Sequence, residues 1–135
     1  MKYAICHVSN ASKNLNLQKI KILLDLWEKK NNSLEIKGIL LYSEGNFFQI
    51  LEGEKDIVLP LFHKIQKDSR HYGLIQIIGK DIAHGSFDGY IADLLDENSP
   101  DNFRVPKEYM EALNGMSPEV KIPMERMLEN FIATR

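Results

Sequence analysis

The chain contains a single cysteine, Cys6, among its 135 residues. One cysteine excludes an intramolecular disulfide framework and any zinc site built on several thiolates, and it suits a reducing, cytoplasmic compartment. An excess of basic charge is also missing, because 17 Lys and Arg stand against 19 Asp and Glu, for a net charge of −2. The sequence is therefore a poor candidate for binding nucleic acid, whose phosphates select basic surfaces.

Long apolar runs are absent as well. No segment approaches the roughly 20 apolar residues that span a bilayer. Residues 1–7 carry one lysine and no apolar stretch of signal-peptide length. Internal repeats and low-complexity runs are also missing. With 44% hydrophobic residues, the chain is expected to form one buried core without a membrane segment.

Apolar periodicity predicts the order of the secondary-structure elements. Residues 15–29 place apolar side chains at the i, i+3, i+4, i+7 spacing of a helix, which Asn14 or Asn16 can cap. A similar helix is expected at about 56–69. Short apolar runs predict strands at about 2–8, 34–43, 47–52, 73–79 and 87–94. This βαββαββ order predicts an α+β fold of the ferredoxin-like kind, with both helices on one face of the sheet.

The C-terminal part differs in composition from the rest. Residues 97–106 are polar with two prolines, and 107–133 are helical in pattern. We therefore expect a domain over residues 1–96, and a linker with a C-terminal helical cap over 97–135. The methionines of the cap are expected to pack on the second face of the sheet, or else to meet a partner; they are Met110, Met116, Met124 and Met127.

Catalytic motifs are not evident. The four histidines are not paired at ligand spacing, so no metal site is predicted. The glycines match neither the dinucleotide-binding nor the P-loop pattern. Cys6 and His7 are adjacent on a predicted strand and point to opposite faces, so a buried structural thiol is favoured over a Cys–His nucleophile. The sequence does not predict an enzyme.

The informative polar side chains are amides. Gln49 lies within the apolar run Phe47-Phe48-Gln49-Ile50-Leu51 and is expected to be partly buried. A buried amide needs partners for its donors and acceptors. Backbone groups can supply them, or the amide can bind a planar heterocycle rich in carbonyls and ring nitrogens. Asn31, expected just after the first helix, is a second such amide.

Three segments together resemble one known family. The run Gly38-Ile-Leu-Leu-Tyr-Ser-Glu-Gly-Asn-Phe-Phe-Gln-Ile-Leu-Glu-Gly53 is similar to the central signature of BLUF domains, which are blue-light sensors that bind FAD. Asp68 followed by Arg70-His71 resembles a second motif of the family. Ser9 and Ala11 after the first strand resemble another, and the resemblance covers about residues 2–95.

The resemblance implies a flavin lying between the two helices, over the sheet. Gln49 would lie beside the N5 and O4 edge of the flavin, where its amide would rearrange on illumination, and Asn31 would bind the carbonyl and N3 side. The remaining cofactor-binding residues implied are His7 and Ser9 of the first strand, Ile22, Leu23 and Ile65 against the ring, and Lys64, Asp68, Arg70 and His71 toward the ribityl and phosphate groups. FAD is the expected cofactor, although FMN and riboflavin carry the same ring.

His7 departs from the family pattern. The family has a tyrosine here, which gives an electron and then a proton to the excited flavin. Imidazole is much harder to oxidise, so we expect an impaired photocycle. His7 can simply fill the space, satisfied by Gln49 or Asn31; it can respond to pH; or a light response can persist by another route.

The fifth strand also departs from the pattern. Tyr90 and Ala92 stand where the family often has a tryptophan and a methionine that help to transmit the signal. Tyr90 is either an ordinary packed aromatic residue or a substitute electron donor, and it is expected to lack the geometric coupling to Gln49. Gln49, Tyr90 and Ala92 are the candidate signalling residues.

Taken together, the sequence predicts a flavin-binding blue-light sensor that is not an enzyme. It would signal through hydrogen bonds around Gln49 to a protein partner, and a homo-oligomer is plausible. The alternative is a light-insensitive protein-interaction module whose flavin slot is empty or purely structural. A flavin-dependent redox enzyme is a third possibility, which the missing nicotinamide site disfavours.

Overall fold

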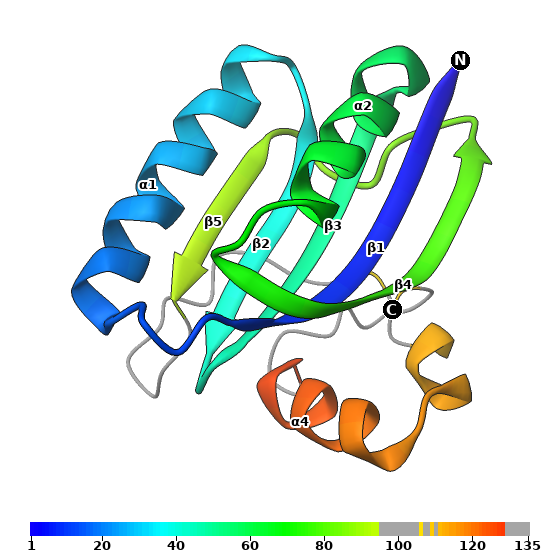
Figure 1. The fold of residues 1–135 in the computed structure, drawn as a ribbon. Coiled ribbons are helices and arrows are strands. Elements are labelled where there is room, and N and C mark those ends of the chain that lie inside the picture. Colours follow the sequence, from blue (N-terminus) through cyan, green and yellow to red (C-terminus); the bar gives the residue numbers. More distant parts are fainter. Residues whose placement is uncertain (95–105, 107–108, 110, 129–135) are drawn as a thin grey trace.

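Five strands form one sheet in the order β4-β1-β3-β2-β5 (Figure 1). The structure is a computed structural model that describes residues 1–94, 106, 109 and 111–128. Neighbouring strands are antiparallel except β2 and β5, which run parallel at one edge. The strands are β1 (Lys2–Ala11), β2 (Lys37–Ser43), β3 (Asn46–Glu54), β4 (His71–Ile82) and β5 (Tyr90–Leu94).

Helices α1 (Leu17–Ser33) and α2 (Lys55–Gln66) lie on one face of this sheet (Figure 1). The Asn16 side chain caps α1 by accepting a hydrogen bond from the backbone N–H of Lys19 at 2.8 Å. An apolar core between the helices and the sheet includes Ile5, Ile20, Leu24, Leu40, Leu51, Val58 and Phe62. The predicted ferredoxin-like α+β fold, with both helices on one face, is confirmed.

The end of α1 differs from the prediction. The helix continues to Ser33, so Asn31 lies in its last turn and not beyond it. Glu35 then adopts a left-handed conformation with φ of 59°, and β2 begins only at Lys37. A strand over the whole of 34–43 was wrong because this tight turn occupies its first residues. As a consequence, the helix itself orients Asn31.

The second face of the sheet is covered by C-terminal residues. A 3₁₀ turn (Ala112–Gly115) is followed by α4 (Pro118–Leu128). Tyr109, Met124 and Leu128 are buried in a core with strand residues Cys6, Val8, Ile39, Leu41, Phe48 and Ile50. Met116 packs at its margin, as expected for the cap, whereas the side chains of Met110 and Met127 lie outside what the structure describes. The boundary predicted at 96/97 also lies outside the described residues and stays a prediction.

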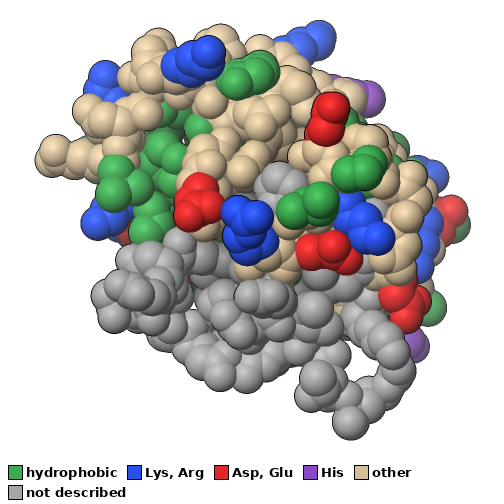
Figure 2. All heavy atoms as spheres, turned by 90° about the horizontal axis from the view of Figure 1, so that it is seen from below, with side chains coloured by type: hydrophobic (Ala, Val, Ile, Leu, Met, Phe, Trp, Pro, Cys, Tyr) green, Lys and Arg blue, Asp and Glu red, His purple; other side chains and the backbone are tan. Residues whose placement is uncertain are grey.

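Charged side chains of both signs are interspersed on the face seen in Figure 2. Neither sign dominates the coloured part of that view, in line with the near-balance of charges in the sequence. Within the described residues, no helix combines the length and the apolar character needed to cross a membrane.

Candidate functional site

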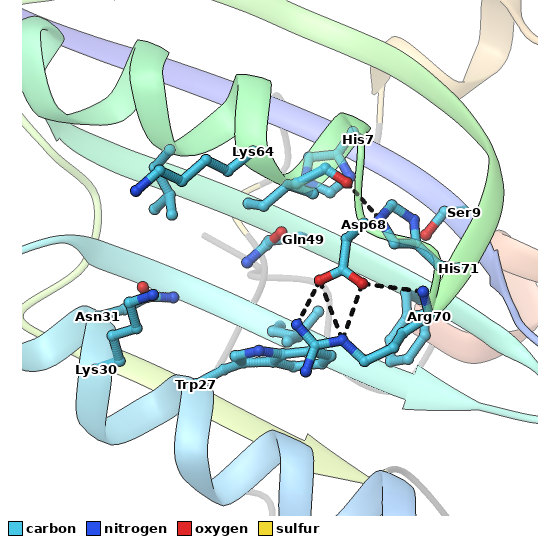
Figure 3. A pocket seen from close by; sticks show the side chains of 14 residues that line it. His7, Ser9, Trp27, Lys30, Asn31, Gln49, Lys64, Asp68, Arg70 and His71 are labelled. Atoms are coloured by element: carbon cyan, nitrogen blue, oxygen red, sulfur yellow. Dashed lines mark hydrogen bonds and ion pairs between the residues drawn. The ribbon is translucent and has the colours of Figure 1, made fainter. Parts of the chain in front are cut away.

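A cavity of about 230 Å³ opens between α1, α2 and the sheet (Figure 3). The sheet contributes side chains from three adjacent strands, which share this face because side chains alternate along a strand. Both helices and the segment after α2 supply the rest. The lining residues are His7, Ser9, Trp27, Lys30, Asn31, Leu40, Phe47, Gln49, Leu61, Lys64, Ile65, Asp68, Arg70 and His71.

The inner end of the cavity carries polar side chains that are almost fully buried. His7 of β1, Gln49 of β3 and Leu40 of β2 form one row across the sheet. The exposed fractions of His7, Gln49 and Asn31 are 2%, 4% and 5%. Figure 3 shows the amides of Gln49 and Asn31 along the same space. Two amides with fixed donors and acceptors can therefore orient a planar ligand in an otherwise apolar slot.

His7 is held in an unusual state. Within the described part of the chain, neither of its ring nitrogens has a hydrogen-bond partner. Its ring packs against that of Phe62, with centroids 5.3 Å apart. Burial lowers the pKa of His7 to about 4; the nearby Gln49 side chain opposes this shift, and charge on His71 adds to it. His7 is therefore neutral at pH 7 and presents an unsatisfied donor and an unsatisfied acceptor.

His71 adds a third unpartnered nitrogen to the two of His7 at the cavity. Its Nε2 lies 2.6 Å from the carbonyl oxygen of Ile65, to which it can donate a hydrogen bond. In the neutral ring, that bond leaves Nδ1 as an acceptor, and Nδ1 is buried without a partner among the described residues. Since buried polar atoms are nearly always paired in folded proteins, these imidazoles indicate a ligand with hydrogen-bonding groups.

The mouth of the cavity is charged. The Arg70 guanidinium binds the Asp68 carboxylate, with Nε at 2.9 Å from Oδ1, and lies over the ring of Trp27 at 5.1 Å (Figure 3). Hydrogen bonding to Arg70 holds the pKa of Asp68 below its usual range, and the same contact raises the pKa of Arg70. Lys30 and Lys64 also line the cavity. This end can meet an anionic group such as a phosphate.

Two of the predicted ring contacts are misplaced. Ile22 is 62% exposed, and neither Ile22 nor Leu23 lines the cavity. Ile22 lies two residues from both Ile20 and Leu24, which are buried, so it projects from the opposite side of α1. Five further residues line the cavity that no sequence pattern had indicated: Trp27, Lys30, Leu40, Phe47 and Leu61. Trp27 could have been found, because it continues the apolar stripe of Ile20 and Leu24.

The expectation that Tyr90 lacks geometric coupling to Gln49 is wrong. The Nε2 of Gln49 donates a hydrogen bond to the Tyr90 hydroxyl, and Tyr90 is 2% exposed. Tyr90 itself does not line the cavity, so it contacts Gln49 from outside the cavity wall. Ala92, the other departure on β5, uses its backbone N–H to bind Glu28 Oε1 of α1 at 2.8 Å.

The polar atoms of the cavity fit a flavin, whose ring combines an apolar plane with an edge of carbonyls and nitrogens. The unpartnered nitrogens of His7 and the amides of Gln49 and Asn31 are complementary to such an edge. Across the described residues, no group of three or more His, Cys, Asp or Glu could hold a metal ion. Fold and cavity thus define an α+β domain built to bind a planar organic ligand.

Comparison with known families agrees with that class. The family described as "BLUF: Sensors of blue-light using FAD" matches residues 3–92, and the chain belongs to this family. BLUF domains are flavin-binding photosensors, and the domain itself is not catalytic.

Similar proteins include larger light-regulated ones. The chain is 31% identical over 62 residues to the blue light- and temperature-regulated antirepressor BluF of Escherichia coli, a match that covers 46% of this chain and 15% of that protein. It is 32% identical over 73 residues to the photoactivated adenylate cyclase subunit beta of Euglena longa, over 54% of this chain and 8% of that protein. The chain therefore spans only a small part of these curated relatives.

Solved structures of light-responsive proteins are also similar to this chain. A bacterial light-regulated adenylyl cyclase is 35% identical with a TM-score of 0.67, over 74% of this chain and 30% of that chain. BlsA in its photo-activated state is 25% identical with a TM-score of 0.68, over 100% of this chain and 97% of that chain.

Proposed function

We propose that this chain binds FAD in the cavity between α1 and α2 and serves as a blue-light sensor whose signal begins at Gln49. The observation that carries the proposal is the set of buried polar groups around an apolar slot: two amides, and two imidazoles with unpartnered nitrogens. A bound flavin supplies the absorption of blue light. The residues then have separate tasks, set by where they lie.

Gln49 and Asn31 bind the polar edge of the ring, while Ile65 contacts its plane. Toward the mouth, Lys64 and Arg70 meet the phosphates, and Asp68 holds the Arg70 guanidinium in place. The charged mouth supports FAD or FMN over riboflavin, which has no phosphate. FAD is proposed because the family description names it.

The light response is proposed to be weaker than a phenol on β1 would allow. His7 occupies the position next to Gln49 in the β1–β3 register. Imidazole is a poorer electron donor than phenol, although the Gln49 side chain lies close enough to His7 to oppose the lowering of its pKa. Tyrosine at this position would supply both an oxidisable ring and a hydroxyl. We therefore expect His7→Tyr to enlarge the light-induced red shift of the flavin band.

The output is proposed to reach a separate protein. The relatives are an antirepressor and adenylate cyclases, in which the matched region is a small part of the whole. By analogy, the present domain acts as the sensor, and rearrangement around Gln49 alters its contacts with a protein partner or a second copy of the chain.

Absorption spectroscopy tests the proposal. Purified protein, incubated with FAD and freed of excess, is measured in darkness and under blue light, and the flavin released by denaturation is identified by chromatography. Gln49→Ala should abolish any light-induced shift. The matched control is Gln76→Ala, because Gln76 is exposed on β4 and outside the cavity. A shift that survives Gln49→Ala contradicts the mechanism.

His7 also favours a second candidate function, a light-insensitive interaction module. In that case the cavity holds flavin only as a structural ligand. The spectrum then shows a flavin band that does not move under blue light, and His7→Tyr does not restore the movement. If the purified protein takes up no flavin, its spectrum has no flavin band, and the interaction module has an empty cavity.

A further inference from the structure

The hydrogen bond between Gln49 and Tyr90 crosses an intervening strand. Gln49 is on β3 and Tyr90 on β5, with β2 between them. Gln49 is in register with Leu40 of β2 and Tyr90 with Gly38, so the two residues are two strand spacings apart across the sheet, about 10 Å, and offset by two positions along it. Both side chains must therefore extend over β2. Gly38 of β2 is in register with Tyr90 and has no side chain there. A Cβ at Gly38 would point into the backbone of β3, 2.0 Å from the carbonyl oxygen of Ile50, so β2 packs closely on β3 beside this contact.

The contact lies in the protein interior. The exposed fractions of Gln49 and Tyr90 are 4% and 2%. Burial raises the pKa of Tyr90 above its usual range, hydrogen bonds from Gln49 and Asn31 oppose this, and the Glu28 carboxylate adds to it. The phenol therefore keeps its proton at physiological pH. A buried amide that lost this partner would have to find another one or leave a donor unsatisfied.

A phenol hydroxyl is compatible with two orientations of the Gln49 amide. It accepts a hydrogen bond from Nε2, as observed. If the amide turned over, the same hydroxyl could donate to Oε1 instead. In the observed orientation, Nε2 binds Tyr90 and Oε1 is left as an acceptor toward the cavity. In the turned orientation, Oε1 would bind Tyr90 and Nε2 would be left as a donor toward the cavity.

The backbone of Tyr90 is attached to α1. Its N–H donates to Asn32 Oδ1 at 3.0 Å, and its carbonyl accepts from Asn32 Nδ2 at 2.9 Å. The preceding residue, Asn31, lines the cavity. The last turn of α1 therefore holds one amide toward the cavity and the next one against β5. A change at Gln49 can reach α1 through the phenol and through Asn32.

We infer that Tyr90 is the residue that positions Gln49: its hydroxyl determines which end of the amide faces the cavity and connects that orientation to β5 and α1. Tyr90 acts through Gln49 and not on the ligand, since it does not line the cavity. The consequence for light sensing rests on the proposed function, whereas the positioning itself does not.

The direct test observes Gln49 in the flavin-free and the flavin-loaded protein by NMR. The side-chain NH₂ signal of Gln49 is assigned by its loss in Gln49→Ala. Tyr90→Phe removes the hydroxyl and keeps the ring. We expect it to shift the Gln49 NH₂ signal and to speed its exchange with solvent about tenfold. Tyr42→Phe is the matched control, because the Tyr42 hydroxyl binds the backbone N–H of Gly45 on the same face of the sheet.

A second measurement observes the Gln49–Tyr90 hydrogen bond through the NMR signal of Tyr90. In protein labelled at the tyrosine ring carbon that carries the hydroxyl, Gln49→Ala should move the Tyr90 signal, and Gln76→Ala should leave it in place. This result decides the matter even if Tyr90→Phe folds poorly. An unchanged Tyr90 signal in Gln49→Ala, or an unchanged Gln49 signal in folded Tyr90→Phe, overturns the inference.

The two proposals fail in different ways. If the wild type takes up no flavin, the proposed function fails, and the NMR of the flavin-free protein still decides whether Tyr90 positions Gln49. If flavin binds and the Gln49 signal ignores Tyr90→Phe, the positioning role is wrong while flavin binding stands. If both hold, Tyr90→Phe should also displace the dark-state flavin band, and Tyr42→Phe should not.

Discussion

The buried imidazole of His7 makes a quantitative prediction about stability and pH. Its pKa falls from 6.5 to about 4 in the folded chain because burial disfavours the charged ring. The unfolded chain therefore binds a proton between pH 6.5 and 4 that the folded chain does not bind. As far as His7 is concerned, the free energy of unfolding therefore has its full value above pH 6.5 and decreases as the pH falls toward 4.

The size of this loss follows from the shift. Each unit of pH between the two pKa values costs about 1.4 kcal/mol, so His7 should reduce the free energy of unfolding by about 2 kcal/mol at pH 5 and about 3 kcal/mol at pH 4, relative to pH 7. His7→Leu removes the titration and the two unpartnered nitrogens together. It should be at least as stable as the wild type at pH 7, and more stable at pH 5.

Urea unfolding of the flavin-free protein at several pH values measures the effect. The quantity of interest is the difference in the free energy of unfolding between wild type and His7→Leu. Contributions from the carboxylates and from the other histidines cancel in this difference. His63→Gln is the control, since His63 is exposed on α2. A difference that stays constant from pH 7 to pH 4 would refute the neutral, buried state assigned to His7.

Three further substitutions test the packing that surrounds the site. Gly38→Ala should destabilise the fold by more than ~3 kcal/mol in thermal unfolding, because its Cβ would lie 2.0 Å from the Ile50 carbonyl oxygen at a φ of +138°. Gly45→Ala, which meets no atom within 4 Å at φ +86°, should cost only about 1–2 kcal/mol; equal losses would contradict the steric argument. Glu52→Ala removes a buried acceptor that binds the Ser86 N–H at 2.6 Å and the Tyr109 hydroxyl at 2.7 Å, and should cost about 1–3 kcal/mol in urea unfolding. The exposed Glu54→Ala should stay within ~0.5 kcal/mol of the wild type, and a harmless Glu52→Ala would show that the cap is held by other contacts. Asn16→Ala should lower the free energy of unfolding by about 1 kcal/mol through loss of the α1 cap, whereas a similar loss for Asn14→Ala would mean that the cap was wrongly assigned.

The sequence was sufficient for the fold and for the centre of the site. Short apolar runs predict β1 and β3, the helical spacing of apolar residues predicts the two helices, and the βαββαββ order predicts their common face. An amide inside an apolar strand pointed to Gln49, and the structure places it, almost fully buried, at the cavity. These features depend on local periodicity, which a single sequence contains.

Features that depend on contacts across the sheet could not be read from local pattern. The reach of Tyr90 to Gln49 depends on β2 lying between β3 and β5, and on β5 running parallel to β2. None of these follows from the residues next to Tyr90. Ile22 is a different case, because its assignment came from family resemblance, and the helical period of Ile20 and Leu24 already placed it on the solvent side.

The most direct test of the central claim is the visible absorption spectrum of the purified protein after incubation with FAD, in darkness and under blue light. We expect a bound flavin band with a red shift under light that is smaller in the wild type than in His7→Tyr. Absence of a bound flavin band in the correctly folded wild type would contradict the assignment of this cavity as a flavin site.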